Sequence, residues 1–156
     1  MCVGRKVFGW TGALLLLGAL ACGGDGGADP IGPDPEIAQF VGDWTAQGMT
    51  LTNVANLEVV VDLVELGATF TLNVQPSGQY TAILVFGLQA STEIGTVSVA
   101  GSTLTLNRNF PSTETAPGTF EFFGPDRFVL DGDSEFDFNL DGSSEPALAH
   151  FDFVRR

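Results

Sequence analysis

The sequence predicts an all-β fold, an antiparallel up-and-down meander that closes into a β-barrel of about eight strands. Two observations support this prediction. Apolar and polar side chains alternate with a period of two over most of the chain after residue 37, as in strands with one buried face. Short turns rich in glycine, proline, serine and aspartate separate these segments, and no helical pattern is long enough for a parallel crossover. A meander of this length most easily removes its open edges by closing into a barrel.

The domain is expected to begin with a short helical turn over residues 35–41. A first strand covers residues 44–51, where a change of phase at Gly48 indicates a β-bulge. Residues 57–66 are ambiguous. Their three consecutive valines favour a strand followed by a short turn, whereas the stretch that ends at Gly67 could also form a glycine-capped helical turn.

The rest of the chain alternates clearly. This alternation predicts strands near residues 70–74, 80–86, 97–99, 104–106, 120–122, 128–130, 136–140 and 149–153. Polar loops are expected at Leu88–Thr92 and Pro111–Gly118, and a tight turn at Gly132–Ser134. One face of the strands is phenylalanine and aliphatic, and the other is Thr, Ser, Asn, Asp or Glu. An outer-membrane barrel has the reverse arrangement around its lumen, so the short strands and the acidic polar face favour a barrel in water.

Residues 1–21 have the pattern of a secretory signal peptide. Two basic residues precede an apolar run that is too short to span a bilayer comfortably, and the small Ala21 precedes Cys22. This junction resembles a bacterial lipobox, in which the signal is removed and the new terminal cysteine is acylated. The commonest lipobox has leucine where Ala19 lies here. The alternative is an ordinary signal peptide that is cut nearby and leaves Cys22 as a free thiol.

The predicted organisation is a signal peptide at 1–21, a lipidated Cys22 with a flexible Gly/Pro/Asp linker at 22–36, and a β-barrel domain at 37–156. Cys22 would be the only cysteine of the mature chain, so acylation gives a lone cysteine a role. Gly23 stands where an aspartate would retain a lipoprotein in the inner membrane. We expect an exported protein, lipid-anchored in the cell envelope, and in the outer membrane if the cell has one.

The charge of the chain excludes one class of partner. Removing residues 1–21 from 156 leaves 135 residues, enough for one domain with its own core. This mature chain keeps four arginines, no lysine and all nineteen acidic residues, a net charge of −15. Such a chain repels phosphate backbones and anionic lipid headgroups. Nucleic acid is therefore excluded as a partner. We expect acyl chains on Cys22 to provide the contact with the membrane.

Gly42-Asp43-Trp44, on the first strand directly after a short helical turn, resembles the Gly-x-Trp motif of the lipocalins. Lipocalins also carry a basic residue on the last strand that packs over this tryptophan. Arg155 shares a face with the phenylalanines before it, so its parity allows it to point inward toward Trp44. The sequence departs from that of classical lipocalins because it has neither their disulfide nor a clear helix late in the chain. We therefore describe it as lipocalin-like and not as a classical lipocalin. The resemblance implies a barrel closed by Gly42, Trp44 and Arg155, with room for one small apolar ligand.

The inner face of the barrel is rich in aromatic and aliphatic side chains, which indicates a pocket for a fatty acid, a lipid or a similar apolar molecule. The candidate ligand-binding residues are Trp44, Phe70, Leu72, Tyr80, Leu84, Phe120, Phe122, Phe136, Phe138, Phe151 and Phe153. Alternatively these rings fill the barrel, since eight strands leave an interior just wide enough for side chains. A filled barrel would act as a protein-interaction or inhibitor module, with the loops at 88–92 and 111–118 as candidate contact regions.

Five acidic residues between Asp131 and Asp141 raise a third alternative, a calcium-stabilised adhesion-type module. An EF-hand that starts at Asp131 is excluded, because its sixth and twelfth places do not hold glycine and glutamate. A looser site formed by Asp131, Asp133 and Asp141 is the remaining metal candidate, against a simple solvated strand face. The single His150 cannot build a zinc site of three or four His and Cys ligands, and no catalytic pair or phosphate loop is marked out. We therefore expect neither catalysis nor a cofactor.

Overall fold

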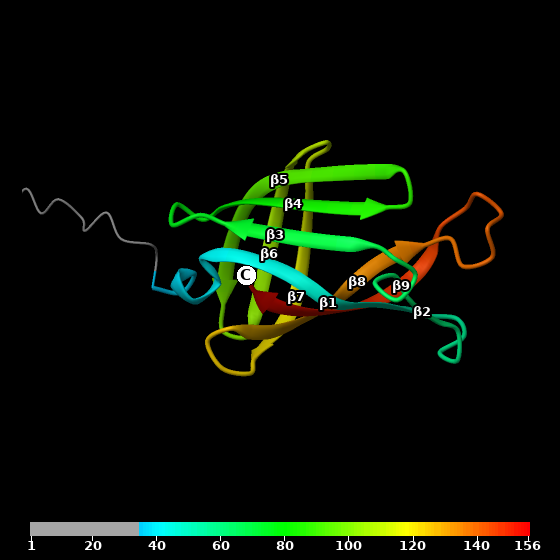
Figure 1. Ribbon diagram of the computed structural model, residues 1–156, viewed down its shortest axis with the longest axis horizontal. Helices are drawn as coiled ribbons and strands as arrows, with labels where there is room; N and C mark the ends of the chain where they lie inside the picture. The colour runs from blue at the N-terminus through cyan, green and yellow to red at the C-terminus, as the bar shows by residue number, and fades with distance from the viewer. Residues whose placement is uncertain (1–34) are drawn as a thin grey trace, which may run out of the picture. The chain divides into compact units, whose positions relative to one another are not determined.

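The computed structural model describes residues 35–156, which form an antiparallel β-barrel (Figure 1). The predicted signal peptide, Cys22 and the linker up to residue 34 lie outside the described residues. The elements are a short 3₁₀ helix, η1 (Ala38–Phe40), and the strands β1 (Gly42–Asn53), β2 (Val60–Asp62), β3 (Thr69–Val74), β4 (Gln79–Phe86), β5 (Gln89–Ala100), β6 (Thr103–Phe110), β7 (Glu114–Phe122), β8 (Arg127–Phe136) and β9 (Glu145–Arg155).

Strand β1 closes the barrel because it pairs with strands from both ends of the meander. Residues Trp44–Asn53 pair with β9, while Gly42–Thr45 pair with β3. Eight strands, β1 and β3–β9, therefore form a closed antiparallel ring, and the predicted fold class is confirmed. The short β2 pairs with the far end of β1, at Thr50–Thr52. The ambiguous residues 57–66 thus contain a short strand followed by a turn, the first of the two alternatives.

Two glycine positions interrupt the ladders and bend the wall of the barrel. The register between β1 and β9 shifts between Ala46 and Gly48, which confirms the β-bulge expected at Gly48. A second shift lies in β5, between Ile94 and Gly95. A β-carbon at Gly95 would collide with the backbone carbonyl of Asn107, so only glycine allows β6 to approach β5 this closely.

The prediction of polar loops at two places is wrong, because both segments are largely strand. The predicted loop at Leu88–Thr92 begins β5, since Gln89 lies opposite Phe86 in a tight hairpin. Most of the predicted loop at Pro111–Gly118 belongs to β7, which starts at Glu114 and pairs with β6. Both segments are polar and lack apolar alternation, but their neighbours in the sheet supply hydrogen-bonding partners for their backbones.

The expected tight turn at Gly132–Ser134 is also wrong. Strand β8 runs straight through it and pairs with β9 over its whole length. Gly132 serves close packing instead, because a β-carbon there would lie 3.2 Å from the carbonyl oxygen of Pro117 on β7. The chain turns later, at residues 137–144, so Phe138 lies in a loop and not on a strand.

Buried side chains form two clusters. The larger lies where β1 begins and is dominated by aromatic rings; Phe40, Trp44, Phe128 and Phe153 are each at most 1 % exposed. We call this the closed end of the barrel, and the opposite end, where β1 ends, the open end. The smaller cluster lies toward the open end and contains Met49, Leu51, Leu63, Ala68 and Ala149. Within residues 35–156, no helix is both long and apolar enough to cross a membrane.

Candidate functional site

A cavity of about 610 Å³ lies inside the barrel, toward its open end. Small-molecule sites in proteins have volumes of about 300–1,000 Å³, so this cavity is large enough for one small molecule. Much of its wall is apolar and is contributed by strands all around the ring. The apolar wall residues are Met49, Phe70, Ala82, Leu84, Leu106, Leu130, Ala149 and Phe151.

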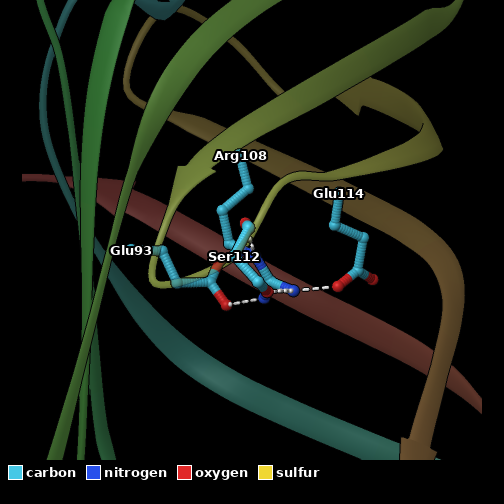
Figure 2. Close-up of polar contacts among 4 residues, drawn as sticks. All are labelled: Glu93, Arg108, Ser112 and Glu114. Carbon is cyan, nitrogen blue, oxygen red and sulfur yellow. Dashed lines mark hydrogen bonds and ion pairs between the residues drawn. The ribbon is translucent and has the colours of Figure 1, made fainter.

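Another part of the wall, on β5, β6 and β7, is ionic (Figure 2). Arg108 lies between two carboxylates: its Nη1 donates to Glu93 Oε1 at 2.7 Å, and its Nη2 donates to Glu114 Oε2. Arg108 also donates from Nε to the carbonyl oxygen of Ser112 at 3.2 Å and from Nη2 to Ser112 Oγ at 3.3 Å. One side chain therefore joins three neighbouring strands and the connection between two of them.

The strand register explains why these charges face the cavity. Arg108 lies opposite Gly95 on β5 and opposite Glu114 on β7, and Gly95 in turn lies opposite Tyr80 on β4. Side chains at directly opposite positions share one face of a sheet. Because Tyr80 is buried inside the barrel, Arg108 and Glu114 face inward as well. Glu93 lies two residues before Gly95 and so shares this face.

Tyr80 adds a buried hydroxyl to the same region. The residue is 1 % exposed and lines the cavity, and its hydroxyl has no hydrogen-bond partner among the described residues. Burial, reinforced by the charge of Glu93 and opposed by Arg108, raises the pKa of Tyr80 to about 12. A buried polar group without a partner costs about 1–3 kcal/mol, so a contact that satisfies this hydroxyl would be favourable.

The wall of the barrel is interrupted between β7 and β8. Strand β7 pairs with β8 only over Gly118–Phe122, and this ladder stops next to Pro117, which has no N–H to donate. Beyond that point β7 pairs with β6, and β8 pairs with β9. Exposed residues on both sides of the interruption, Thr115–Pro117 on β7 with Asp133 and Glu135 on β8, line the cavity. The cavity therefore reaches the surface through a lateral opening.

The residues that the lipocalin resemblance singles out meet at the closed end. Gly42 has a φ of +135°, and a β-carbon there would collide with Nη1 of Arg155, so both the backbone and the close approach require glycine. The Arg155 guanidinium lies 4.2 Å from the ring centroid of Trp44 and donates to the carbonyl oxygen of Val41 at 2.7 Å. Trp44 Nε1 donates to the carbonyl oxygen of Phe40 at 2.7 Å. These contacts tie the first and last strands to η1.

The predicted ligand-binding residues divide between the cavity and the packed core. Four of them line the cavity: Phe70, Tyr80, Leu84 and Phe151. The other seven do not line it and pack in the two clusters instead: Trp44, Leu72, Phe120, Phe122, Phe136, Phe138 and Phe153. Aromatic rings therefore fill the closed half of the interior, whereas the open half holds the cavity.

The ionic part of the wall was not among the residues predicted from the sequence. Arg108 continues the inner-face period of Leu104 and Leu106, and Glu93 has the same parity as Val97. Charged residues at two inner-face positions are unusual enough to indicate a site. Glu114 gives no such indication, because its strand is polar and has the composition of a loop.

The structure does not bring Asp131, Asp133 and Asp141 together as a metal site. Asp131 Oδ1 lies 2.6 Å from Nδ1 of His150 across the β8–β9 ladder, and Asp141 lies in the loop after β8. In the described part of the chain, no group of three or more His, Cys, Asp and Glu side chains is placed to hold a metal ion. The looser calcium site is therefore not supported.

The chain was compared with family models, curated proteins and solved structures. No protein-family model matches the chain, and no curated protein matches it. A solved structure described as EF1p2_mFAP2b bound to DFHBI is similar, with 17 % sequence identity and a TM-score of 0.49. The match covers 78 % of this chain and 97 % of that chain.

Proposed function

We propose that this protein is a non-catalytic binding protein that holds one small, largely apolar molecule inside its barrel. The observation that carries the proposal is the cavity of about 610 Å³, which has a largely apolar wall and lies within a closed ring of paired strands. Such a ring holds the wall in place before a ligand arrives, which lowers the ordering cost of binding. The lateral opening between β7 and β8 offers a route for the ligand.

Native mass spectrometry of the full chain carrying Cys22→Ser, purified without detergent, tests this function. We expect a co-purifying adduct of small-molecule mass that is lost on collisional activation. Ser91→Trp should remove the adduct, because Ser91 is an exposed residue of the cavity lining and a large ring there would occupy the space. Thr92→Trp, the neighbouring position on the outer face of β5, is the matched control. An adduct that survives Ser91→Trp would lie elsewhere and would contradict the proposal.

The same proposal includes the cellular setting: an exported lipoprotein of the cell envelope, anchored through acyl chains on Cys22. Its support is the pattern of residues 1–22, and a tether of this kind would keep the barrel next to a supply of apolar molecules. Metabolic labelling of expressing bacteria with palmitate tests it. Label on the native chain and none on Cys22→Ser is expected, whereas an unlabelled native chain in the soluble fraction would overturn the anchor.

Exposed leucines at the open end favour a second candidate function, a protein-interaction module. Leu57, Leu66, Leu88 and Leu140 lie on four connections of this end and are each at least 62 % exposed. Apolar side chains gathered on one surface are typical of contact sites. A partner captured by the native chain and lost from a Leu88→Ser, Leu140→Ser variant that still carries its adduct would support this candidate. Capture that is equal for both chains would contradict it.

A further inference from the structure

Carboxylates outnumber cations in the wall of the cavity. Five charged side chains line it: Arg108 is the cation, and the carboxylates are Glu93, Glu114, Asp133 and Glu135. Glu93 and Arg108 face the interior directly, and Asp133 and Glu135 flank the lateral opening. The ionic region of the cavity is therefore negative both inside and at its mouth.

The single cation is already neutralised. A guanidinium has five N–H donors, and the contacts of Arg108 with Glu93, Glu114 and Ser112 use four of them. Arginine binds a carboxylate strongly when two adjacent N–H groups form a bidentate contact. No such pair is left on Arg108. A carboxylate ligand would have to displace Glu93 or Glu114 from the guanidinium.

Tyr80 indicates where the polar group of a ligand would lie. Its hydroxyl is buried, has no partner among the described residues, and lies within electrostatic reach of both Glu93 and Arg108. An alcohol or an amine at this place could hydrogen-bond the hydroxyl and the Glu93 carboxylate together. A carboxylate at this place would face the like charge of Glu93.

We infer that the cavity binds neutral or positively charged amphiphiles, such as long-chain alcohols and amines, and discriminates against long-chain carboxylates. The inference rests on the proposed ligand-binding function and adds the charge class of the ligand. This selectivity also narrows the class of ligands that the sequence predicts, because it disfavours fatty acids. Beside an apolar wall the effective dielectric constant is well below that of water, so repulsion from the unbalanced carboxylates is stronger than at an open surface.

Three probes that share one alkyl chain and differ in the headgroup test this inference: decan-1-ol, decylamine and decanoate. Each is titrated at neutral pH into the full chain carrying Cys22→Ser, with isothermal calorimetry as the readout. We expect the alcohol and the amine to bind and decanoate to bind at least about tenfold more weakly than the alcohol, since like charges that face each other in a binding site are strongly disfavoured.

Variants of the ionic wall separate charge from shape. Glu114→Gln keeps the size of the side chain but removes a negative charge beside Arg108, so it should strengthen decanoate binding by about fivefold or more and leave decan-1-ol nearly unchanged. Glu93→Gln should act in the same direction. Because the Glu114 side chain is 59 % exposed, we expect its substitution to leave folding intact. Glu121→Gln, on the outer face of β7, is the matched control and should change neither probe.

The possible results separate a failure of the charge selectivity from a failure of the proposed ligand-binding function. Decanoate that binds as tightly as decan-1-ol would overturn the charge selectivity and leave the binding function standing. The same holds if Glu114→Gln and Glu121→Gln affect decanoate equally. Failure of all three probes to bind, together with a native mass spectrum free of adducts, would overturn the binding function and the inference with it.

Discussion

Tyr80 is the only tyrosine of the chain, so the absorbance of its phenolate can be followed without interference from another phenol. We expect the titration midpoint of the folded protein near pH 12 and not near 10, because burial and the charge of Glu93 raise the pKa of this hydroxyl. A midpoint near 10 in protein that is still folded by circular dichroism would show that the hydroxyl is solvated.

The raised pKa of Tyr80 also predicts how stability depends on pH. The unfolded chain releases the phenolic proton near its ordinary pKa of 10.0, whereas the folded chain keeps it until about 12. Ionisation of Tyr80 therefore leaves the free energy of unfolding unchanged below pH 10 and lowers it as the pH rises from 10 through 12. Tyr80→Phe should remove this decline in urea unfolding experiments. At neutral pH it should raise the free energy of unfolding by about 1 kcal/mol, because it deletes an unpaired buried hydroxyl.

Arg155 carries more contacts than its place at the end of the chain suggests. It lies over the Trp44 ring and donates to backbone carbonyls of the segment before β1 and of the β7–β8 turn. Arg155→Lys keeps the charge but loses the planar fork of donors, and should lower the free energy of unfolding by about 1–3 kcal/mol. Arg156→Lys, at the exposed next position, is the control. Equal unfolding midpoints for the two variants would show that Arg155 does not tie the barrel closed.

At the scale of single elements, the strands differ in why they form. The alternating segments are predictable because one buried apolar face produces a pattern with a period of two. The first residues of β5 and β7 are strand for another reason: their neighbours offer backbone partners, and polar side chains suffice on a wall that borders a cavity. Sequence alternation cannot reveal such strands, and for this reason Glu114, which lies on one of them, gives no indication of a site.

Two glycines inside strands, Gly95 and Gly48, differ in how much space a β-carbon would find. Gly95→Ala would force a β-carbon against the backbone of β6, so we expect a loss of about 1–3 kcal/mol of stability or more. Gly48→Ala is the matched control, because the nearest atoms to a β-carbon there lie 3.8 Å away, an ordinary contact. Chemical denaturation of both variants measures the difference. Equal stability would contradict the close approach of β5 and β6.

In the whole molecule, the alternation along each strand determines which side chains point into the barrel. It does not determine how much of the interior those side chains fill. The closed half is filled because the segment before β1 adds Phe40 to the rings of Trp44, Phe128 and Phe153. The open half stays hollow because β7 leaves β8 at Pro117 and its inner positions carry glutamate and alanine where the closed end has rings. Which inward phenylalanines border the cavity thus depends on contacts between strands distant in the sequence.

This division predicts that identical substitutions cost different amounts in the two halves. Leu104 and Leu106 lie two residues apart on the inner face of β6, but Leu104 is 1 % exposed in the packed core whereas Leu106 lines the cavity. Leu104→Ala would open a new void and should cost about 2–5 kcal/mol. Leu106→Ala only enlarges an existing space that reaches the surface, so it should cost roughly 1–2 kcal/mol, near the transfer free energy of the lost methyl groups.

Urea unfolding of the two alanine variants, compared at equal denaturant slopes, measures this difference. The decan-1-ol titration adds a second readout, because Leu106→Ala should alter probe affinity and Leu104→Ala should not. A Leu106→Ala variant as destabilised as Leu104→Ala, with unchanged probe binding, would mean that the open half of the barrel is packed in solution. The protein would then have to act through its surface.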